Sequence, residues 1–179
     1  MAMHRSGDLH EVIKVVNDQF SGLGLKFDSA NFAQIDSEGS WDLWISARPA
    51  QIHIPCFDHR MFTQLNEAVV KGLDFFAEVY DYEEKNLFFN HVFENTILKN
   101  TPEERKQFVL NSEGFVRSVL PTKNIWLSVI KFDAIPFSDE ENAIFKRFAN
   151  VFEQSYIRFL DLQKAEAQTR EAQINLAVE

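Results

Sequence analysis

The sequence predicts an α+β domain: a central antiparallel sheet of about five or six strands, helices on both faces, and a long C-terminal helix. Short runs of alternating apolar and polar residues lie near both ends of the chain, whereas amphipathic helical patterns fill its middle. In addition, residues 138–179 contain neither proline nor glycine and read as one helix. This order favours antiparallel pairing, with the middle helices on one face and the first and last helices on the other.

The composition limits the class of protein. A length of 179 residues suits one domain, and a hydrophobic content of 45%, including 18 phenylalanines, provides a substantial core. The net charge of −9 argues against nucleic acid and anionic membrane as partners. No apolar run approaches the roughly 20 residues that span a bilayer. The polar start and the single cysteine, Cys56, which permits no internal disulfide, predict a cytoplasmic protein.

The first third of the chain reads as a helix, a hairpin and a short extended segment. A helix is expected to begin near Asp8 and to be ended by Gly22 and Gly24, because five apolar residues share one of its faces: Leu9, Val12, Ile13, Val16 and Phe20. Residues 27–48 alternate around a Ser-Glu-Gly turn and predict a hairpin. The segment that follows contains Pro55, so we expect an edge strand or a connector there.

The middle of the chain alternates helices with single strands. We expect a helix capped by Asp58 and stopped by Gly72, a strand at 75–80, and a helix opened by the capping-box sequence at 81–84. A short helix begins at the Thr-Pro-Glu-Glu sequence that starts with Thr101. Two alternating runs then predict a second hairpin, 115–120 and 125–132.

The final helix changes character along its length. Ser138 and Glu141 form a capping box, and bulky residues then make a core-facing stripe: Phe145, Phe148, Phe152, Tyr156 and Phe159. Beyond this stripe a narrow seam continues in steps of three and four: Ile157, Leu160, Lys164, Ala167, Glu171, Ile174 and Val178. A narrow seam on a polar helix is typical of a two-stranded coiled coil. We therefore expect a domain at 1–160 and the start of a coiled coil at 161–179, within a longer protein.

Several segments resemble GAF domains, the small-molecule sensory domains of bacterial signalling proteins. The resemblance is carried by Ile-Pro-Cys-Phe-Asp-His at 54–59, Asp-Phe-Phe-Ala-Glu-Val at 74–79, Glu-Glu-Lys-Asn at 83–86 and Phe-Ala-Asn-Val-Phe-Glu at 148–153. Residues 158–174 resemble the signalling helix that joins such domains to a histidine kinase or related output domain, and Met1–His4 resemble the end of a similar linker. The resemblance covers essentially the whole chain. It implies a GAF-like fold and a signalling role, and it names no ligand.

The sequence departs from three better-known GAF groups. The spaced Asn-Lys-Phe-Asp-Glu signature of the cyclic-nucleotide-binding members is absent, because Lys123 precedes its asparagine and Phe137 is too close to Asp139. Cys56 does not adjoin His59 as in bilin-binding members, and one cysteine does not suffice for a thiol–disulfide reductase cycle. The cofactor therefore stays unknown.

Eight residues are candidates for contact with a ligand. Arg48 and Arg117 lie on predicted strands among aromatic residues, where a guanidinium can bind an anion in a fork; either can equally be solvated or pair with Glu78. His91 lies on the helix that would border the cavity of a GAF fold, either as a ligand contact or as a satisfied structural histidine. The full set is Trp44, Ser46, Arg48, Tyr80, Phe88, His91, Arg117 and Ser128.

We expect no metal site and no catalytic set. His53, Cys56 and His59 have ligand-type side chains at steps of three, but they fall on a proline-bent segment and a helix start, where ordinary packing and capping suffice. Cys56 is interpreted as a small buried side chain. No nucleophile and base stand out in the sequence, so an enzyme is the weakest interpretation.

Two functions then remain: a sensory domain that passes the ligand state to a downstream output domain through a parallel dimeric helix, and a ligand-free module for dimerisation and relay. An enclosed cavity with polar groups favours the first, and a cavity filled with phenylalanine favours the second. The predicted partners are a second copy, bound through the N- and C-terminal helices, an output domain in the same chain, and a possible small-molecule ligand. The dimer interface is expected to contain Phe152, Tyr156, Ile157, Leu160, Ala167 and Ile174.

Overall fold

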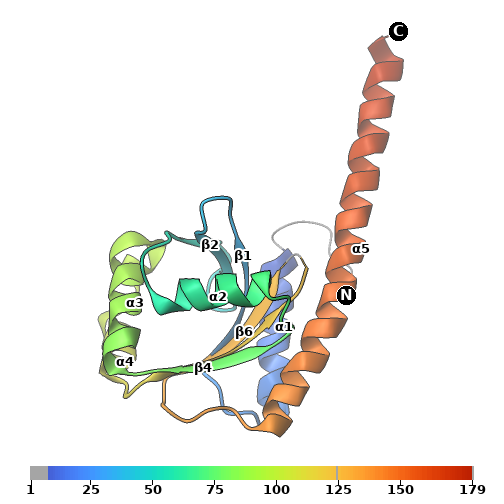
Figure 1. The fold of residues 1–179 in the computed structure, drawn as a ribbon. Helices are drawn as coiled ribbons and strands as arrows, with labels where there is room; N and C mark the ends of the chain where they lie inside the picture. The colour runs from blue at the N-terminus through green and yellow to red at the C-terminus, as the bar shows by residue number, and fades with distance from the viewer. Residues whose placement is uncertain (1–7, 124, 179) are drawn as a thin grey trace.

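The structure, a computed structural model, describes residues 8–123 and 125–178 and shows one antiparallel sheet with helices on both faces (Figure 1). The sheet has six strands in the order β3-β2-β1-β6-β5-β4. The strands are β1 (Ser29–Ile35), β2 (Trp41–Ile45), β3 (Ile52–Ile54), β4 (Phe76–Tyr80), β5 (Phe115–Pro121) and β6 (Trp126–Lys131). The helices are α1 (Asp8–Gly22), α2 (Arg60–Val70), α3 (Tyr82–Asn95), the 3₁₀ helix η1 (Ile97–Asn100), α4 (Glu103–Asn111) and α5 (Asp139–Val178). The α+β class, both hairpins and the edge position of β3 are confirmed.

Helices α1 and the first half of α5 cover one face of the sheet. Phe20 of α1 lies 5.1 Å from Phe145 of α5, measured between ring centroids, and Phe32 of β1 stacks on Phe152 at 3.9 Å. Every second residue of a strand points to this side, as the pleat requires. The apolar stripe of each helix therefore packs on the same core, as its periodicity predicts.

Helices α2, α3 and α4 cover the opposite face. Their core contains Trp41 of β2, Phe62 of α2 and Phe88 of α3, with Trp41 stacked on Phe62 at 4.1 Å. This layer is less completely filled than the other one, because a cavity remains between the sheet and α3. The division into middle helices on one face and terminal helices on the other is confirmed.

Two helix starts have the capping boxes that the local sequence predicts, whereas α4 begins at Glu103 with Pro102 at its N-cap rather than at the first helical position. Asp81 and Glu84 form the expected capping box at α3, and Ser138 and Glu141 form the one at α5. The expected cap of α2 by Asp58 is wrong. His59 caps this helix instead, because its Nδ1 accepts from the backbone N–H of Met61 at 3.1 Å.

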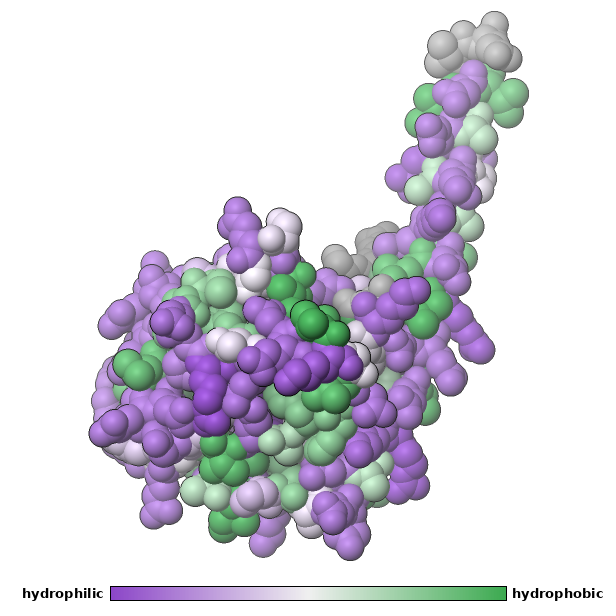
Figure 2. All heavy atoms as spheres, viewed as in Figure 1, coloured by the Kyte–Doolittle hydropathy of each residue, from purple (hydrophilic) through white to green (hydrophobic). Residues whose placement is uncertain are grey.

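Helix α5 begins inside the domain and then leaves it (Figure 1). All residues from 161 to 177 are exposed, and the projecting part is mostly hydrophilic on the face that Figure 2 shows. Among the described residues, no helix combines the length and the apolar composition needed to cross a bilayer. The predicted linker at Met1–His4 lies outside the described residues, as does the side chain of Val178.

Two residues expected in a dimer interface belong to the core of their own subunit. Phe152 and Tyr156 are each less than 10% exposed, and Tyr156 accepts a hydrogen bond from Gln34 of β1 at 2.9 Å. Both residues belong to the core-facing stripe and lie outside the seam that begins at Ile157, and the stripe packs against the sheet. Leu160 is half-buried against the same core, whereas Ile157, Ala167 and Ile174 are exposed.

Candidate functional site

A cavity of about 600 Å³ lies between the sheet and the helical layer of α3, η1 and α4. Its floor is the sheet face formed by β1, β2, β3, β5 and β6. Its roof comes mainly from α3 and α4, together with Met61 of α2. The volume is within the range of small-molecule sites in proteins. The exposed residues Ala47, Pro102 and Arg105 also line it, so the cavity reaches the surface between the β2–β3 connection and the start of α4.

Most of the cavity wall is apolar. The aromatic and aliphatic side chains come from both layers and include Trp41, Leu43, Ile52, Phe88, Phe89, Phe93, Phe115, Trp126 and Phe132. A wall of this kind favours a ligand with an apolar body, because the ligand buries that body away from water.

Two polar residues lie side by side in the floor. Asn31 of β1 and Ser128 of β6 are opposite each other in the strand register, and both line the cavity. They are only 7% and 5% exposed, respectively, and neither side chain has a hydrogen bond with any other residue that the structure describes. Their polar atoms are not among the fully enclosed atoms without a partner, which in the described residues are Trp41 Nε1 and Asn86 Oδ1, so they are open to the cavity. These two groups therefore call for a polar partner inside the cavity.

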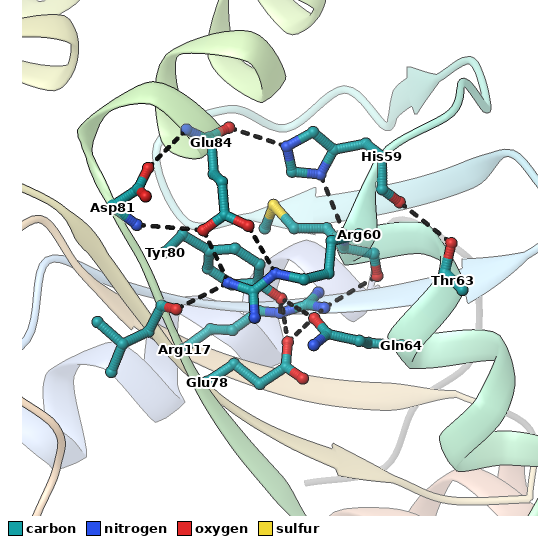
Figure 3. A network of polar contacts seen from close by, with 11 residues as sticks. His59, Arg60, Thr63, Gln64, Glu78, Tyr80, Asp81, Glu84 and Arg117 are labelled. Carbon is teal, nitrogen blue, oxygen red and sulfur yellow. Dashed lines mark hydrogen bonds and ion pairs between the residues drawn. The ribbon is translucent and has the colours of Figure 1, made fainter.

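Arg117 of β5 is the charged residue in the floor. Its side chain is 3% exposed, its Nε donates to the hydroxyl of Tyr80 at 3.0 Å, and its Nη2 donates to the carbonyl of Met61 at 2.9 Å. Glu78, its partner in the register of β4 and β5, lies 3.7 Å from Nη2 (Figure 3). The remaining nitrogen, Nη1, makes no hydrogen bond to the part of the chain that the structure describes. One arm of a buried guanidinium is thus free beside the cavity.

The groups behind Arg117 fix its position. Tyr80 donates its hydroxyl hydrogen toward Glu78, and Gln64 of α2 lies 2.8 Å from the same hydroxyl (Figure 3). Burial raises the pKa of Tyr80 above its ordinary value, so the hydroxyl stays protonated. On the far side of the Tyr80 ring, Arg60 forms an ion pair with Glu84 at 2.8 Å, joining α2 to α3. Arg117 is therefore held by a hydrogen-bonded framework that does not need a ligand.

His59 connects the starts of two helices. Its Nδ1 accepts from Met61, so the proton lies on Nε2, which donates to the carbonyl of Glu84 at 2.8 Å (Figure 3). Burial lowers the pKa of His59 below 6.5, which favours this neutral form. The imidazole is fully used as a structural link.

Two more arginines and one carboxylate line the cavity near its opening to the surface. Arg48 of the β2–β3 connection and Arg105 of α4 line the cavity, and neither forms an ion pair with a described residue. Arg105 lies over the rings of Phe108 and Phe132 instead. The carboxylate of Asp28 accepts from the backbone N–H of Phe132 at 2.7 Å. The described wall therefore contains three guanidinium groups and one carboxylate.

Lys85 of α3 supports the roof from behind. It is fully buried, and its ammonium group donates to the carbonyls of Val109 and Leu110 in the last turn of α4. A cation at this end of a helix is favourable, because the helix dipole is negative there. Burial nevertheless lowers the pKa of Lys85 to about 8. The residue holds α4 against α3, and Val109 of α4 lines the cavity.

The structure brings five of the eight predicted ligand-binding residues to the cavity wall: Ser46, Arg48, Phe88, Arg117 and Ser128. Arg117 also pairs with Glu78, the alternative that the sequence left open. Whether these residues contact a ligand stays a prediction. Asn31, Trp41 and Arg105 also line the cavity and were not among the candidates.

The other three predicted residues lie elsewhere. Trp44 points to the opposite face and packs in the core of α1 and α5, because strand residues alternate and Trp41 and Leu43 occupy the cavity side. Tyr80 lies behind Arg117. His91 donates from Nε2 to the carbonyl of Pro55 at 2.8 Å and stacks on Phe57, so it has the structural role that the sequence left open.

The three candidates weighed for a metal lie in separate environments. His53 pairs with Asp42 at 2.8 Å, His59 caps α2, and Cys56 is exposed, so its interpretation as a buried side chain is wrong. Within residues 8–123 and 125–178, no three histidine, cysteine or acidic side chains are grouped as a metal site requires.

No family model matches the sequence, and no curated protein matches it significantly. Among solved structures, the chain is similar to the GAF domain of a two-component sensor histidine kinase from Bacillus halodurans. The TM-score is 0.48 and the sequence identity 14%, over 84% of this chain and 95% of that chain. The similarity concerns the arrangement of helices and strands, and what this protein binds is inferred below from its own cavity.

Proposed function

We propose that this chain is a small-molecule-sensing regulatory domain of a cytoplasmic signal-transduction protein. In this proposal a ligand occupies the cavity, and its presence changes the position of α5, which pairs with α5 of a second copy and acts on a downstream output domain. The observation that carries the proposal is the cavity of about 600 Å³ whose floor holds buried polar side chains, Asn31 and Ser128, without partners among the described residues. A ligand-free relay module has no need for such a floor.

The sheet supplies a short path from the cavity to α5. In β1, Asn31 faces the cavity and the next residue, Phe32, stacks on Phe152 of α5 at 3.9 Å. In β5, Arg117 faces the cavity and the next residue, Ser118, donates to Asn142 of α5 at 2.6 Å. A shift of either strand on ligand binding therefore moves residues that contact α5 directly.

The wall favours binding over catalysis. The described residues that line the cavity include no histidine, cysteine or lysine, and their one carboxylate, that of Asp28, accepts from the backbone N–H of Phe132 and forms no hydrogen bond with a serine or threonine hydroxyl among them. A ligand in this site would be held and released unchanged, and its effect would arise from its different affinity for two positions of α5.

Analysis of protein purified without unfolding tests the proposal. Small molecules released by denaturation are identified by mass spectrometry for the wild type and for Ser128→Phe, in which the new ring occupies the cavity floor. The control is Ser37→Phe, at an exposed turn. We expect one compound to be enriched with the wild type and the control and to be absent from Ser128→Phe.

A screen of metabolites by thermal unfolding complements this measurement, because a ligand that binds only the native state raises the unfolding temperature. The sensory function is wrong if no compound is retained and if no compound raises the unfolding temperature of the wild type more than it raises that of Ser128→Phe. The relay module then becomes the better description.

A further inference from the structure

We propose that the ligand of the cavity is a small organic acid, with its carboxylate on the sheet floor against Arg117, Ser128 and Asn31 and its apolar body between Trp41 and Phe88. The inference rests on the proposed sensory function and specifies the chemical class of the ligand.

The free arm of Arg117 is the first ground. Nε and Nη2 are committed to Tyr80 and Met61, whereas Nη1 has no hydrogen-bond partner among the described residues. The Arg117 side chain is 3% exposed and its two hydrogen-bond acceptors, the Tyr80 hydroxyl and the Met61 carbonyl, are neutral, so a charged acceptor at Nη1 would be bound strongly. The carboxylate of Glu78, at 3.7 Å from Nη2, is beyond hydrogen-bond distance of that nitrogen.

The position of the neutral donors is the second ground. Ser128 and Arg117 lie on neighbouring strands and on the same face, as diagonal neighbours about 7–8 Å apart. Asn31 is directly opposite Ser128 on the other side. A hydroxyl, an amide and a guanidinium arm therefore form one row across the floor. One carboxylate has two oxygens with about four acceptor positions, which suits three donors arranged in this way.

The charge distribution is the third ground. The chain as a whole carries −9, yet the described cavity wall holds three arginines and a single carboxylate, that of Asp28, which accepts from a backbone N–H. Arg48 and Arg105 stand near the opening without carboxylate partners among the described residues. A positive opening on an acidic protein raises the local concentration of anions and repels cations.

A monoanion fits the floor better than a dianion. Glu78 already balances part of the charge of Arg117, so the floor offers less than one full positive charge. Burying a phosphate dianion there would leave charge uncompensated, which is costly in an apolar cavity. The surrounding aromatic wall requires, in addition, that the rest of the ligand be apolar.

Nuclear magnetic resonance titration with two matched compounds tests the class. The probes are 3-phenylpropionate and its neutral amide, 3-phenylpropionamide, and the signals are those of the tryptophan indole N–H groups. Trp41 and Trp126 line the cavity, whereas Trp44 lies on the opposite face and serves as an internal control. We expect the acid to shift the signals of Trp41 and Trp126 and to bind at least about tenfold more tightly than the amide, because charge-assisted hydrogen bonds are lost in the amide.

Variants then identify the groups that recognise the charge. Ser128→Ala is expected to weaken binding of the acid about tenfold and to change binding of the amide little. Arg105→Gln is expected to reduce the dependence of acid binding on salt, whereas the control Arg147→Gln, an exposed position of α5, leaves it unchanged. Arg105→Gln removes the contact of an exposed guanidinium with the rings of Phe108 and Phe132, and neither change truncates a buried apolar side chain, so both variants are expected to fold.

Several results would overturn the inference. They are equal binding of acid and amide, tighter binding of phenyl phosphate than of 3-phenylpropionate, and no shift of Trp41 or Trp126 by the acid at millimolar concentration. These outcomes leave the sensory function standing if a neutral or phosphorylated compound is released from the native protein. Absence of any retained compound contradicts the sensory function itself.

Discussion

At the scale of single residues, Arg117 shows how one side chain joins the framework to the cavity. Its Nε and Nη2 hold Tyr80 and the carbonyl of Met61, so β5, β4 and α2 are connected through one guanidinium. The same group leaves Nη1 free toward the cavity. Arginine suits this position because its planar fork offers five donors in fixed directions, whereas a lysine offers a single point charge.

His59 gives the protein a pH-dependent stability below neutrality. The pKa of His59 is lowered in the folded state, so at acid pH the unfolded chain binds more protons than the folded one, and stability falls as the pH drops below 6.5. We expect the free energy of unfolding, measured in urea, to decrease from pH 6.5 toward the lowered pKa. His59→Asn keeps a capping oxygen but does not titrate, so it should lose less stability over this range. Parallel curves for both proteins would rule out this role.

Lys85 makes the stability depend on pH in the alkaline range. Its pKa is lowered from 10.5 to about 8, so between these values the folded state has lost a proton that the unfolded state retains, and stability rises with pH. The raised pKa of Tyr80 has the reverse effect above pH 10, and the gain should end there. Urea unfolding between pH 8 and 10 should therefore show a rising midpoint for the wild type and a flat one for Lys85→Met.

At the scale of elements, α5 consists of two parts with different surroundings. Up to Phe159 the helix presents buried aromatic residues to the sheet, and from residue 161 to 177 every position is exposed. One uninterrupted helix thus belongs first to the core and then to the solvent. Any rotation or tilt of the first part is transmitted to the second, since no glycine or proline interrupts it.

Two substitutions in α5 separate these parts. Phe152→Ala removes a ring stacked on Phe32 and is expected to lower the free energy of unfolding by about 3–5 kcal/mol. Gln168→Ala lies on the exposed part, outside the seam, and should change it by less than about 0.5 kcal/mol. Chemical denaturation measures both. Equal losses would show that the projecting part packs against the domain in solution.

Leu160 stands at the transition between the two parts. It is half-buried against the core of α1 and α5, so part of its side chain remains accessible to a second copy. Leu160→Glu is therefore expected to weaken a dimer while leaving the domain folded. Circular dichroism and light scattering of the same sample distinguish the outcomes. Loss of the fold would assign Leu160 to the core rather than to an interface.

At the scale of the whole molecule, the exposed seam predicts a parallel dimer through α5. Ile157, Ala167 and Ile174 remain exposed in the single chain, and they recur in steps that suit a coiled coil. Size-exclusion chromatography with light scattering should give twice the mass of 20.8 kDa. Ile174→Glu places a charge in the seam and should shift the protein toward the monomer, whereas Thr169→Glu, on the opposite side of the helix, should not. A strict monomer at high concentration would contradict the relay through α5.

Much of the fold could be predicted because it depends on local patterns. The capping boxes at Asp81 and Ser138, the alternation of the two hairpins and the stripe of α5 each concern residues a few positions apart. The cap of α2 could not be predicted in this way. His59 displaced Asp58 because the carbonyl of Glu84, 25 residues away, accepts from its Nε2.

The cavity residues were only partly predictable for a similar reason. The alternating spacing predicted that Trp44, Ser46 and Arg48 share one face of the strand. The strand ends at Ile45, however, and the alternation stops there. Ser46 and Arg48 therefore reach the cavity, whereas Trp44 faces the other side of the sheet. Asn31 stood out in no local pattern. Its significance comes from Ser128, its neighbour across β1 and β6, and from their common burial without partners among the described residues.

The amino-acid sequence by itself determined the α+β class, the two layers of helices and the length of α5, because these depend on periodicity and on capping residues within one or two turns. Only the tertiary structure decided which side chains face the cavity, that Phe152 and Tyr156 pack against β1 rather than a partner, and that Arg117 keeps one free arm. The physical reason is that burial and hydrogen-bond pairing depend on residues far apart in the chain, and no local spacing records which of them meet.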